Sequence, residues 1–541
     1  MPTSFPRCPR RAVLRLIFLT LPVRLLIAAV TGLGYGESYY TLNALNPQLS
    51  YFDQPPLAFW LASASGYLCG GLTALTLRLP SLICFAVITY LMFLLGKKLF
   101  SARAGFYAAL LLNLSMVFTG TTAMWLQPDA ALMLFWLATA LCLTHIFFRE
   151  FPDDVAAARW RRSAACHGWW VLTGVFLGLT TLSKYHALFL FAGAGLFALT
   201  TPKMRRWLFH PGPYLALLIG LLVASPIFIW NAENNWVSFL FQSSRAGVSG
   251  EFSLHWAWLA QSLGGQALWL LPWIWLPLMW QLYKCFAAGR ADAARWFLAC
   301  AAILPIVFFT VVTLWSKLGF HFHWQAPGYL MLFPALGAAT AAMLDGAAEK
   351  IRAWTKRWLW LSGICCVFFM VILQLHAATG FWTWFGPKYW AAKFGEDDPT
   401  LEGFDYDALR EFFINNNYLD DERIFLAVTR WYDAGKAGWA LRGKKPVLVL
   451  NDDPRNPAFL YPQKELLGKD AILMSRYASE EEIRRVTGGV FAEVRRLPDL
   501  EIVRGGVVEL RLPLYYCREM TGEYQYPDHY RRALAKAGGG N

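Results

Sequence analysis

Two short motifs near the start of the chain place a carboxylate among aromatic residues. Residues 36–40 (Gly-Glu-Ser-Tyr-Tyr) contain Glu37, and residues 51–57 (Tyr-Phe-Asp-Gln-Pro-Pro-Leu) contain Asp53. A positioned carboxylate can take a proton from an acceptor hydroxyl as a general base. The Pro-Pro pair after Gln54 favours an extended backbone that would hold Asp53 in place. Glu37 is the first candidate for such a base, and Asp53 is a second candidate or a ligand of a substrate or metal.

Each acid also has a plain structural interpretation. Glu37 could complement the dipole at a helix N-terminus, and Asp53 could be a turn residue. A third acid, Asp129, follows Pro128 at the start of an apolar segment, where a capping charge is the ordinary role. The position of Asp129 still allows contact with a substrate.

Four isolated cations could stabilise a phosphate group. Arg78, Lys184, Arg245 and Lys317 lie in loops, or at the edges of apolar segments, that otherwise carry almost no positive charge. Arginine and lysine form strong charge-assisted hydrogen bonds to phosphate. The alternative is that these long side chains anchor helices at the membrane surface.

A histidine-aromatic run, residues 321–324 (His-Phe-His-Trp), offers further polar groups. His321 and His323 could contact a sugar or a metal. An i, i+2 histidine pair on an irregular loop is a poor metal signature by itself, and packing in an aromatic belt at the membrane surface is the competing interpretation.

The composition indicates which elements must position these residues. The chain is 57% hydrophobic and 16% charged, whereas soluble domains carry roughly 25% charged residues. A membrane span needs about 20 apolar residues. Segments that fit this pattern predict about eleven transmembrane helices, at 13–33, 77–96, 104–120, 129–148, 169–183, 185–201, 212–231, 257–282, 297–315, 326–344 and 358–378.

The distribution of basic residues predicts the topology. Alternate loops carry clusters of three or four Lys or Arg residues, such as Arg7–Arg15 and Lys350–Arg357. Positive loops remain on the cytoplasmic side, so we expect a cytoplasmic N-terminus and the acidic motifs on the outer face. The net charge of +13 is explained by these clusters, and we expect no nucleic-acid partner.

The composition changes near residue 379, where acidic residues, proline and glycine return. Strands are predicted at 423–429, 446–450, 471–474 and 506–512, and helices at 431–442 and 479–486. We therefore expect a transmembrane domain over 1–378, with its first outer loop at about 34–76, and a small extracytoplasmic α/β domain over 379–541.

The ordered motifs resemble a known family. Glu-x-Tyr-Tyr, Tyr-Phe-Asp-x-Pro-Pro-Leu, Arg-Leu-Pro-Ser, Pro-Asp-Ala and Ser-Lys-Tyr follow one another in the chain. This order is similar to the bacterial branch of the protein O-mannosyltransferases, which includes the lipid A aminoarabinose transferases. These are membrane glycosyltransferases of the GT-C fold, similar to glycosyltransferase family 39. The resemblance covers residues 10–380, and the C-terminal domain is similar in kind with weaker motifs.

The resemblance implies a function and a set of partners. It implies transfer of a monosaccharide from a polyprenyl-phosphate carrier to lipid A, another glycan or a protein, at the outer face of the bacterial inner membrane. No cofactor is certain, although some relatives use a divalent metal. The candidate substrate-binding residues are Tyr39, Tyr40, Gln54, Arg78, Asp129, Lys184, Tyr185, Arg245, Lys317, His321 and His323.

Two departures from the family pattern bear on this function. Relatives carry Asp-Glu where this chain has Gly36-Glu37, and that Asp is the proposed base in the family; relatives also often carry His or Lys in place of Gln54. A catalytically silent family member that acts as a binding or assembly subunit is therefore an alternative. A transporter or flippase of lipid-linked sugars is disfavoured, because the acids cluster outside the spans and no internal repeat is visible.

Overall fold

The computed structural model describes residues 8–247, 253–316, 321–346, 348–382 and 398–537. The chain divides into two compact units. Unit 1 consists of Met1–Leu25, Leu79–Phe228 and Gln242–Phe368, and unit 2 of Leu26–Arg78, Ile229–Phe241 and Phe369–Asn541. The motifs at 36–40 and 51–57 thus belong to the same unit as the C-terminal sheet. The expected domain division at residue 379 stays a prediction.

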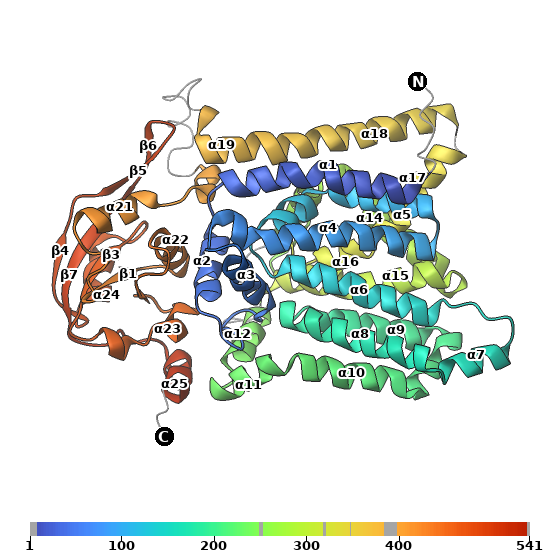
Figure 1. The fold of residues 1–541 in the computed structure, drawn as a ribbon, viewed down its shortest axis with the longest axis horizontal. Helices are drawn as coiled ribbons and strands as arrows, with labels where there is room; N and C mark the ends of the chain where they lie inside the picture. The colour runs from blue at the N-terminus through green and yellow to red at the C-terminus, as the bar shows by residue number, and fades with distance from the viewer. Residues whose placement is uncertain (1–7, 248–252, 317–320, 347, 383–397, 538–541) are drawn as a thin grey trace. The chain divides into compact units, whose positions relative to one another are not determined.

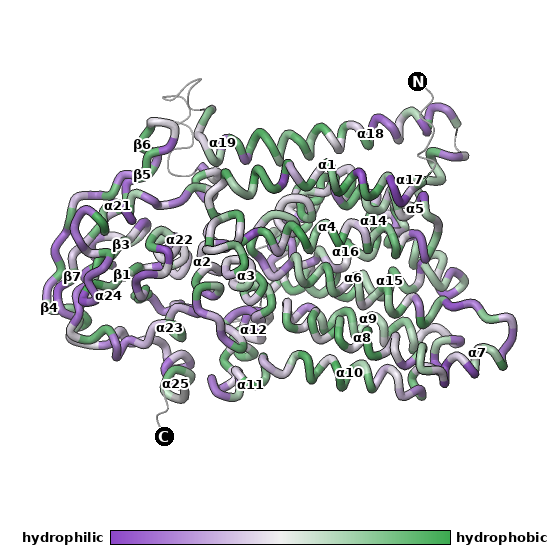
Figure 2. The backbone as a smooth tube through the Cα atoms, viewed as in Figure 1, coloured by the Kyte–Doolittle hydropathy of each residue, from purple (hydrophilic) through white to green (hydrophobic). Residues whose placement is uncertain are grey.

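Long apolar helices dominate the described residues. Seven of them are long and apolar enough to cross a membrane, and two bent pairs raise this number to as many as nine. Figure 2 shows hydrophobic residues along most of α4 (Ala74–Leu99) and α6 (Asp129–Phe147), and hydrophilic residues along α7 (Asp154–Arg161). The protein is therefore a predominantly helical integral membrane protein.

All eleven segments that were expected to span the membrane are helical, but several are interrupted. The expected span 257–282 is broken at Leu271, which has a φ of 71° and precedes Pro272 at the start of α14 (Pro272–Ala288). Proline has no N–H for the preceding helix and restricts the residue before it. The expected span 104–120 consists of α5 (Ala102–Asn113) followed by a short π-helical segment. The exact number of eleven spans stays a prediction.

Small residues let the helices of unit 1 approach closely. Helix α8 (Ala164–Ser183) packs against α6 and α10 (Pro211–Val223). A Cβ atom on Gly174 would lie 2.6 Å from the Ala216 carbonyl oxygen, and one on Gly178 would lie 2.8 Å from that of Gly220. Glycines four residues apart on one helix face allow this contact between backbones, as in other membrane helices.

Figure 1 labels most of the remaining helices of unit 1 and of the segments where the chain passes between the two units. Their bounds are α1 (Pro9–Val30), α9 (Ala187–Thr200), α11 (Ser225–Glu233), α12 (Val237–Ala246), α13 (Trp256–Leu270), α14 (Pro272–Ala288), α15 (Ala293–Val311), α16 (Ala326–Leu330), α17 (Phe333–Asp345), α18 (Glu349–Val367) and α19 (Gln374–Thr379).

Unit 2 is built around a mixed five-stranded sheet in the order β2-β1-β3-β7-β4. Strand β1 pairs in parallel with β2 and β3, whereas β7 is antiparallel to β3 and β4. A separate hairpin pairs β5 with β6. The strands are β1 (Ile424–Val428), β2 (Val447–Val449), β3 (Asp470–Met474), β4 (Phe491–Arg496), β5 (Leu500–Arg504), β6 (Val507–Leu512) and β7 (Leu514–Met520).

Helices cover both faces of this sheet. All five residues of β1 are buried, as expected for a parallel strand between two helical layers. Leu426 packs with residues of α22 (Trp431–Ala440), and Phe425 packs on the other face with residues of α24 (Glu480–Thr487). The other helices of unit 2 are α2 (Tyr35–Leu45), α3 (Leu57–Leu68), α21 (Asp407–Asn415), α23 (Pro457–Leu460) and α25 (Asp528–Ala537).

The motif helix α2 lies directly on α22. A Cβ atom on Gly435 would lie 2.2 Å from the backbone nitrogen of Tyr39, so only glycine permits this approach. The buried Lys436 donates hydrogen bonds to the carbonyl oxygens of Leu33, Glu402 and Phe404. The C-terminal part of the chain therefore fixes the position of the first acidic motif.

Candidate functional site

Glu37 is held in a buried ion pair at the start of α2. Its Oε1 accepts a hydrogen bond from Arg78 Nε at 2.8 Å, and its Oε2 accepts one from Arg78 Nη2 at 2.6 Å. The side chain also accepts a hydrogen bond from the Gly34 backbone N–H at 3.1 Å. Glu37 is 2% exposed. This bidentate contact is the strongest geometry available to a carboxylate and an arginine.

The guanidinium group of Arg78 has further partners within unit 2. Nη1 donates to the carbonyl oxygens of Ala28 and Thr31 and to the Thr31 hydroxyl, and Nη2 donates to the Gly32 carbonyl oxygen. Arginine has five N–H donors, and these contacts account for the whole fork. In this arrangement Arg78 positions Glu37 and the end of α1.

Asp53 lies in a loop that the C-terminal sheet domain holds in place. The side chain of Asn456 accepts a hydrogen bond from the Phe52 N–H at 3.0 Å and donates one to the Asn43 side chain at 2.7 Å. Asp53 is 3% exposed, and its Oδ2 lies 4.0 Å from Arg455 Nη1. The Asp53 carboxylate therefore lies farther from Arg455 than the Glu37 carboxylate lies from Arg78.

Arg455 is a site residue that the sequence analysis missed. Its guanidinium carbon lies 3.7 Å from the centre of the Trp431 ring, and its Nε donates to Asp453 at 3.1 Å. Although burial alone would lower the pKa of Arg455, Asp453 and Asp53 together raise it above its ordinary value. The Asp-Pro-Arg-Asn-Pro sequence after β2 could have drawn attention to Arg455. Nothing in the sequence links this motif to Asp53.

The aromatic residues of the first motif surround these acids. Burial and the nearby Asp53 raise the pKa of Tyr39 well above its ordinary value, and its hydroxyl accepts a hydrogen bond from the Asn456 N–H at 3.2 Å. Tyr40 is half-buried, and its ring centre lies 5.1 Å from that of Phe59. Gln54 is half-buried beside Asp53. These residues belong to unit 2.

A second set of site residues lies in unit 1. Lys184 Nζ donates to Asp129 Oδ1 at 3.1 Å and to Oδ2 at 3.0 Å, and both residues are buried. Lys184 follows the end of α8, whereas Asp129 begins α6. Asp129 thus has a partner as well as a place at a helix N-terminus.

Two histidines and an arginine belong to the same set. Burial lowers the pKa of His323; Lys184 and Arg245 act in the same direction, and Asp129 opposes them. Burial, Lys184, His323 and Arg245 lower the pKa of His186 in the same way. Lys184 and Arg245 both act on His186 and His323, so two cations belong to this set.

Ring contacts and burial describe the positions of the other predicted site residues. The guanidinium group of Arg245 lies 4.9 Å from the centre of the Trp324 ring, and the ring of His321 stacks on Trp324 at 4.6 Å. Tyr185 is half-buried next to Lys184. Lys317 lies outside the described residues.

A metal site was left open by the sequence analysis. In the described ranges, no group of three or more His, Cys, Asp or Glu side chains could hold a metal ion. The pair His321 and His323 has its ring centres 5.9 Å apart. The donor set in these ranges does not fit a protein-held metal ion, and metal dependence stays a prediction.

Parts of the chain are similar to known proteins. Residues 53–230 match the family model described as dolichyl-phosphate-mannose-protein mannosyltransferase. The chain is 24% identical over 374 residues to undecaprenyl phosphate-alpha-4-amino-4-deoxy-L-arabinose arabinosyl transferase of Aeromonas hydrophila. The chain resembles the bacterial branch of the GT-C membrane glycosyltransferases. The match covers 65% of this chain and spans 59% of the length of that relative.

Solved structures show the same fold. ArnT from Cupriavidus metallidurans, bound to undecaprenyl phosphate, matches with a TM-score of 0.61 at 15% identity, over 93% of this chain and 97% of that one. The archaeal oligosaccharyltransferase AglB from Archaeoglobus fulgidus, in complex with an inhibitory peptide and a dolichol-phosphate, matches with a TM-score of 0.50 at 11% identity, over 97% of this chain and 77% of that one. The chain thus shares its fold with these solved structures.

Proposed function

We propose that the chain transfers a monosaccharide from a polyprenyl-phosphate carrier to a lipid, glycan or protein acceptor at the outer face of the inner membrane. The observation that carries this proposal is the buried carboxylate of Asp53, which lies 4.0 Å from Arg455 in a loop that Asn456 holds through the Phe52 N–H. The undecaprenyl phosphate bound to the Cupriavidus relative and the arabinosyl transfer named for the Aeromonas relative support the choice of donor.

We assign different roles to the two acids. Both oxygens of Glu37 already accept hydrogen bonds from Arg78, so an acceptor hydroxyl would have to displace an arginine contact to reach them. Asp53 is buried in the loop that Asn456 holds, beside Arg455 and Tyr39. We assign proton abstraction to Asp53 and assign Glu37 a positioning role in α2, which reverses the preference drawn from the sequence.

The cations of unit 1 suit the leaving group. A phosphate that departs from the anomeric carbon gains negative charge, and preorganised cations lower the energy of that state. Lys184 is oriented by Asp129, and the guanidinium group of Arg245 lies over the Trp324 ring. Lys184 and Arg245 are thus the proposed phosphate ligands, with Tyr39, Tyr40, Gln54, Tyr185, His321, His323 and Lys317 as further substrate-binding candidates.

A second function has one observation in its favour. A Cβ atom on Gly36 would meet no atom within 4 Å, so the space of the family's aspartate is empty in this chain. A silent family member that binds the carrier or an acceptor without transferring sugar accounts for this gap.

The test uses the full chain in lipid nanodiscs with an undecaprenyl-phosphate-linked monosaccharide and a panel of lipid and glycan acceptors. We expect transfer by the wild type and a loss of about 100-fold or more in Asp53→Asn, with a smaller loss in Glu37→Gln. Asp420→Asn, which changes an exposed carboxylate, is the matched control. If undecaprenyl phosphate binds but no donor is consumed, the result supports the silent family member and contradicts the sugar transferase.

A further inference from the structure

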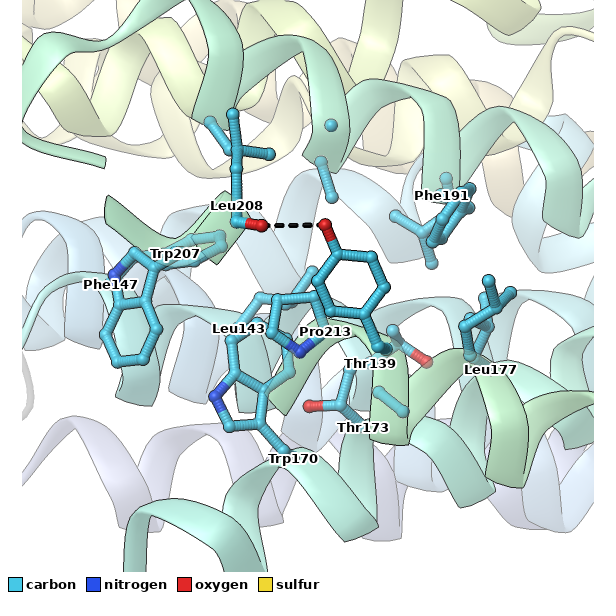
Figure 3. Close-up of a pocket in the computed structure, with 17 residues that line it drawn as sticks. Thr139, Leu143, Phe147, Trp170, Thr173, Leu177, Phe191, Trp207, Leu208 and Pro213 are labelled. Carbon is cyan, nitrogen blue, oxygen red and sulfur yellow. Dashed lines mark hydrogen bonds between the residues drawn. The ribbon is translucent and has the colours of Figure 1, made fainter. Parts of the chain in front are cut away.

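Unit 1 contains an apolar cavity away from the residues discussed above. It has a volume of about 170 Å³ and lies between α6, α8, α9, α10 and the 3₁₀ segment η2 (Pro202–Phe209). Figure 3 shows its aromatic and aliphatic lining. The side chains that define it include Phe147, Trp170, Leu190, Phe191, Trp207 and Tyr214.

The helix geometry keeps this space open. Segment η2 turns by 118° from α9, and the Tyr214 hydroxyl donates to the Leu208 carbonyl oxygen at 2.7 Å, which ties η2 to α10. Leu190 and Trp170 are 1% and 3% exposed, whereas Phe191 and Tyr214 are 43% and 62% exposed. The cavity therefore has a buried interior and a rim on the outer surface of the bundle.

The lining suits a hydrocarbon chain. An apolar cavity of roughly 150 Å³ lined by aliphatic and aromatic side chains stays free of water and takes up small hydrocarbons. In this chain the helices that form the walls carry apolar residues toward the bilayer. A lipid acyl chain is the hydrocarbon present at high concentration around such a rim.

The end of the cavity at η2 has a different chemistry. The indole N–H of Trp207 is buried and has no hydrogen-bond acceptor among the described residues. Arg205 and Arg206 precede Trp207 and are exposed. The Trp160 ring packs at 6.1 Å from that of Trp207, and the guanidinium group of Arg149 lies 5.3 Å from the Trp160 ring centre. This end thus combines an unpaired donor with several cations.

We propose that the cavity binds one acyl chain of an anionic glycerophospholipid from the bilayer. The chain lies between α8, α9 and α10, an ester or phosphate oxygen accepts from the Trp207 indole, and the headgroup faces Arg205 and Arg206. The attraction of basic groups at the membrane surface for anionic lipids supports this orientation. The proposal does not depend on the sugar-transfer function.

The test measures retained lipid on the full chain by native mass spectrometry after reconstitution with phosphatidylglycerol, phosphatidylcholine or undecaprenyl phosphate. Gly195 lines the cavity, and a Cβ atom on it would meet no atom within 4 Å, so Gly195→Leu adds apolar volume at the cavity wall from a position with open space. We expect the wild type to retain phosphatidylglycerol, and we expect Gly195→Leu to retain at least 10-fold less of it. Gly363→Leu, at an equally open glycine of α18, should retain it.

A second pair of variants tests the headgroup end. Arg205→Gln with Arg206→Gln should reduce the preference for phosphatidylglycerol over phosphatidylcholine at least 5-fold, and Lys356→Gln with Arg357→Gln, an exposed cation pair on α18, should not. Equal retention in wild type and Gly195→Leu would overturn the proposal. It would also be overturned if undecaprenyl phosphate, rather than phosphatidylglycerol, were the lipid that Gly195→Leu displaces.

Discussion

Glu37 and Arg78 form a buried bidentate ion pair, with atom distances of 2.8 Å and 2.6 Å. Removal of one partner leaves the other charged and buried. We expect Arg78→Met to lower the free energy of unfolding by about 3–5 kcal/mol, measured by thermal and chemical unfolding in detergent.

Restoring a neutral pair tests the cause of that loss. The double variant Glu37→Gln with Arg78→Met buries no charge, so it should recover part of the stability of the single variant. Arg423→Gln, whose side chain is 86% exposed, serves as the control. A change of less than about 0.5 kcal/mol in Arg78→Met, the range of ordinary surface substitutions, would contradict the role of this pair.

Gly36 offers a gain-of-function prediction. The position is the second residue of α2 and has open space around it, so Gly36→Asp should fold without strain. An acid in the first turn favours the helix dipole, and the substitution should raise stability by about 0.3–1 kcal/mol. We expect sugar transfer to rise as well, because this aspartate is the base proposed for the family.

Gly36→Asn is the isosteric control for that variant. It fills the same space without a carboxylate, so the rise in transfer, measured as product formed per minute, should be confined to Gly36→Asp. Equal activity of the aspartate variant and the asparagine variant would mean that a carboxylate at this position takes no part in transfer.

Asp433 on α22 predicts a pH-dependent stability. It is fully buried, neither carboxyl oxygen has a hydrogen-bond partner in the described residues, and burial raises its pKa to about 7. The folded state therefore keeps a proton that the unfolded chain releases near pH 4. Since the folded state binds more protons, the free energy of unfolding should fall as pH rises from 4.5 to 7.5, by up to about 3–4 kcal/mol.

The variant Asp433→Asn isolates this contribution. It cannot titrate, so the difference in melting temperature between it and the wild type should favour the variant increasingly from pH 4.5 to pH 7.5. Asp420→Asn provides the comparison, because Lys444 lowers the pKa of the exposed Asp420 carboxyl and its effect has the opposite sign. Parallel melting curves for Asp433→Asn and wild type across this range would refute the interpretation.

Secondary-structure elements with strong local patterns could be predicted from the sequence. Contacts between side chains far apart in the chain could not. Strand β1 and helix α22 lie within a residue or two of their predicted bounds, because runs and periodic patterns of apolar residues are local signals. The buried Arg24 of α1 donates to Thr20, one turn away, and also to Asn113 and Thr119, which lie far along the chain and carry no motif. Arg455 was missed for the same reason, since only the fold brings it to Asp53.

Arg245 supplies the sharpest test of the phosphate site. Its guanidinium group lies over the Trp324 ring, and the Ser316 hydroxyl donates to its carbonyl oxygen at 2.7 Å, so both ends of the residue are placed. If Arg245 contacts the phosphate of the carrier, Arg245→Gln should weaken inhibition by free undecaprenyl phosphate about 10-fold, since a charge-assisted hydrogen bond is worth about 1.5–3 kcal/mol. Arg245→Lys should lose less, because it keeps the charge but not the fork. Arg352→Gln, which removes an exposed cation of α18, is the control. An equal loss of inhibition in that variant would mean that Arg245 acts through its charge alone and not through contact with the phosphate.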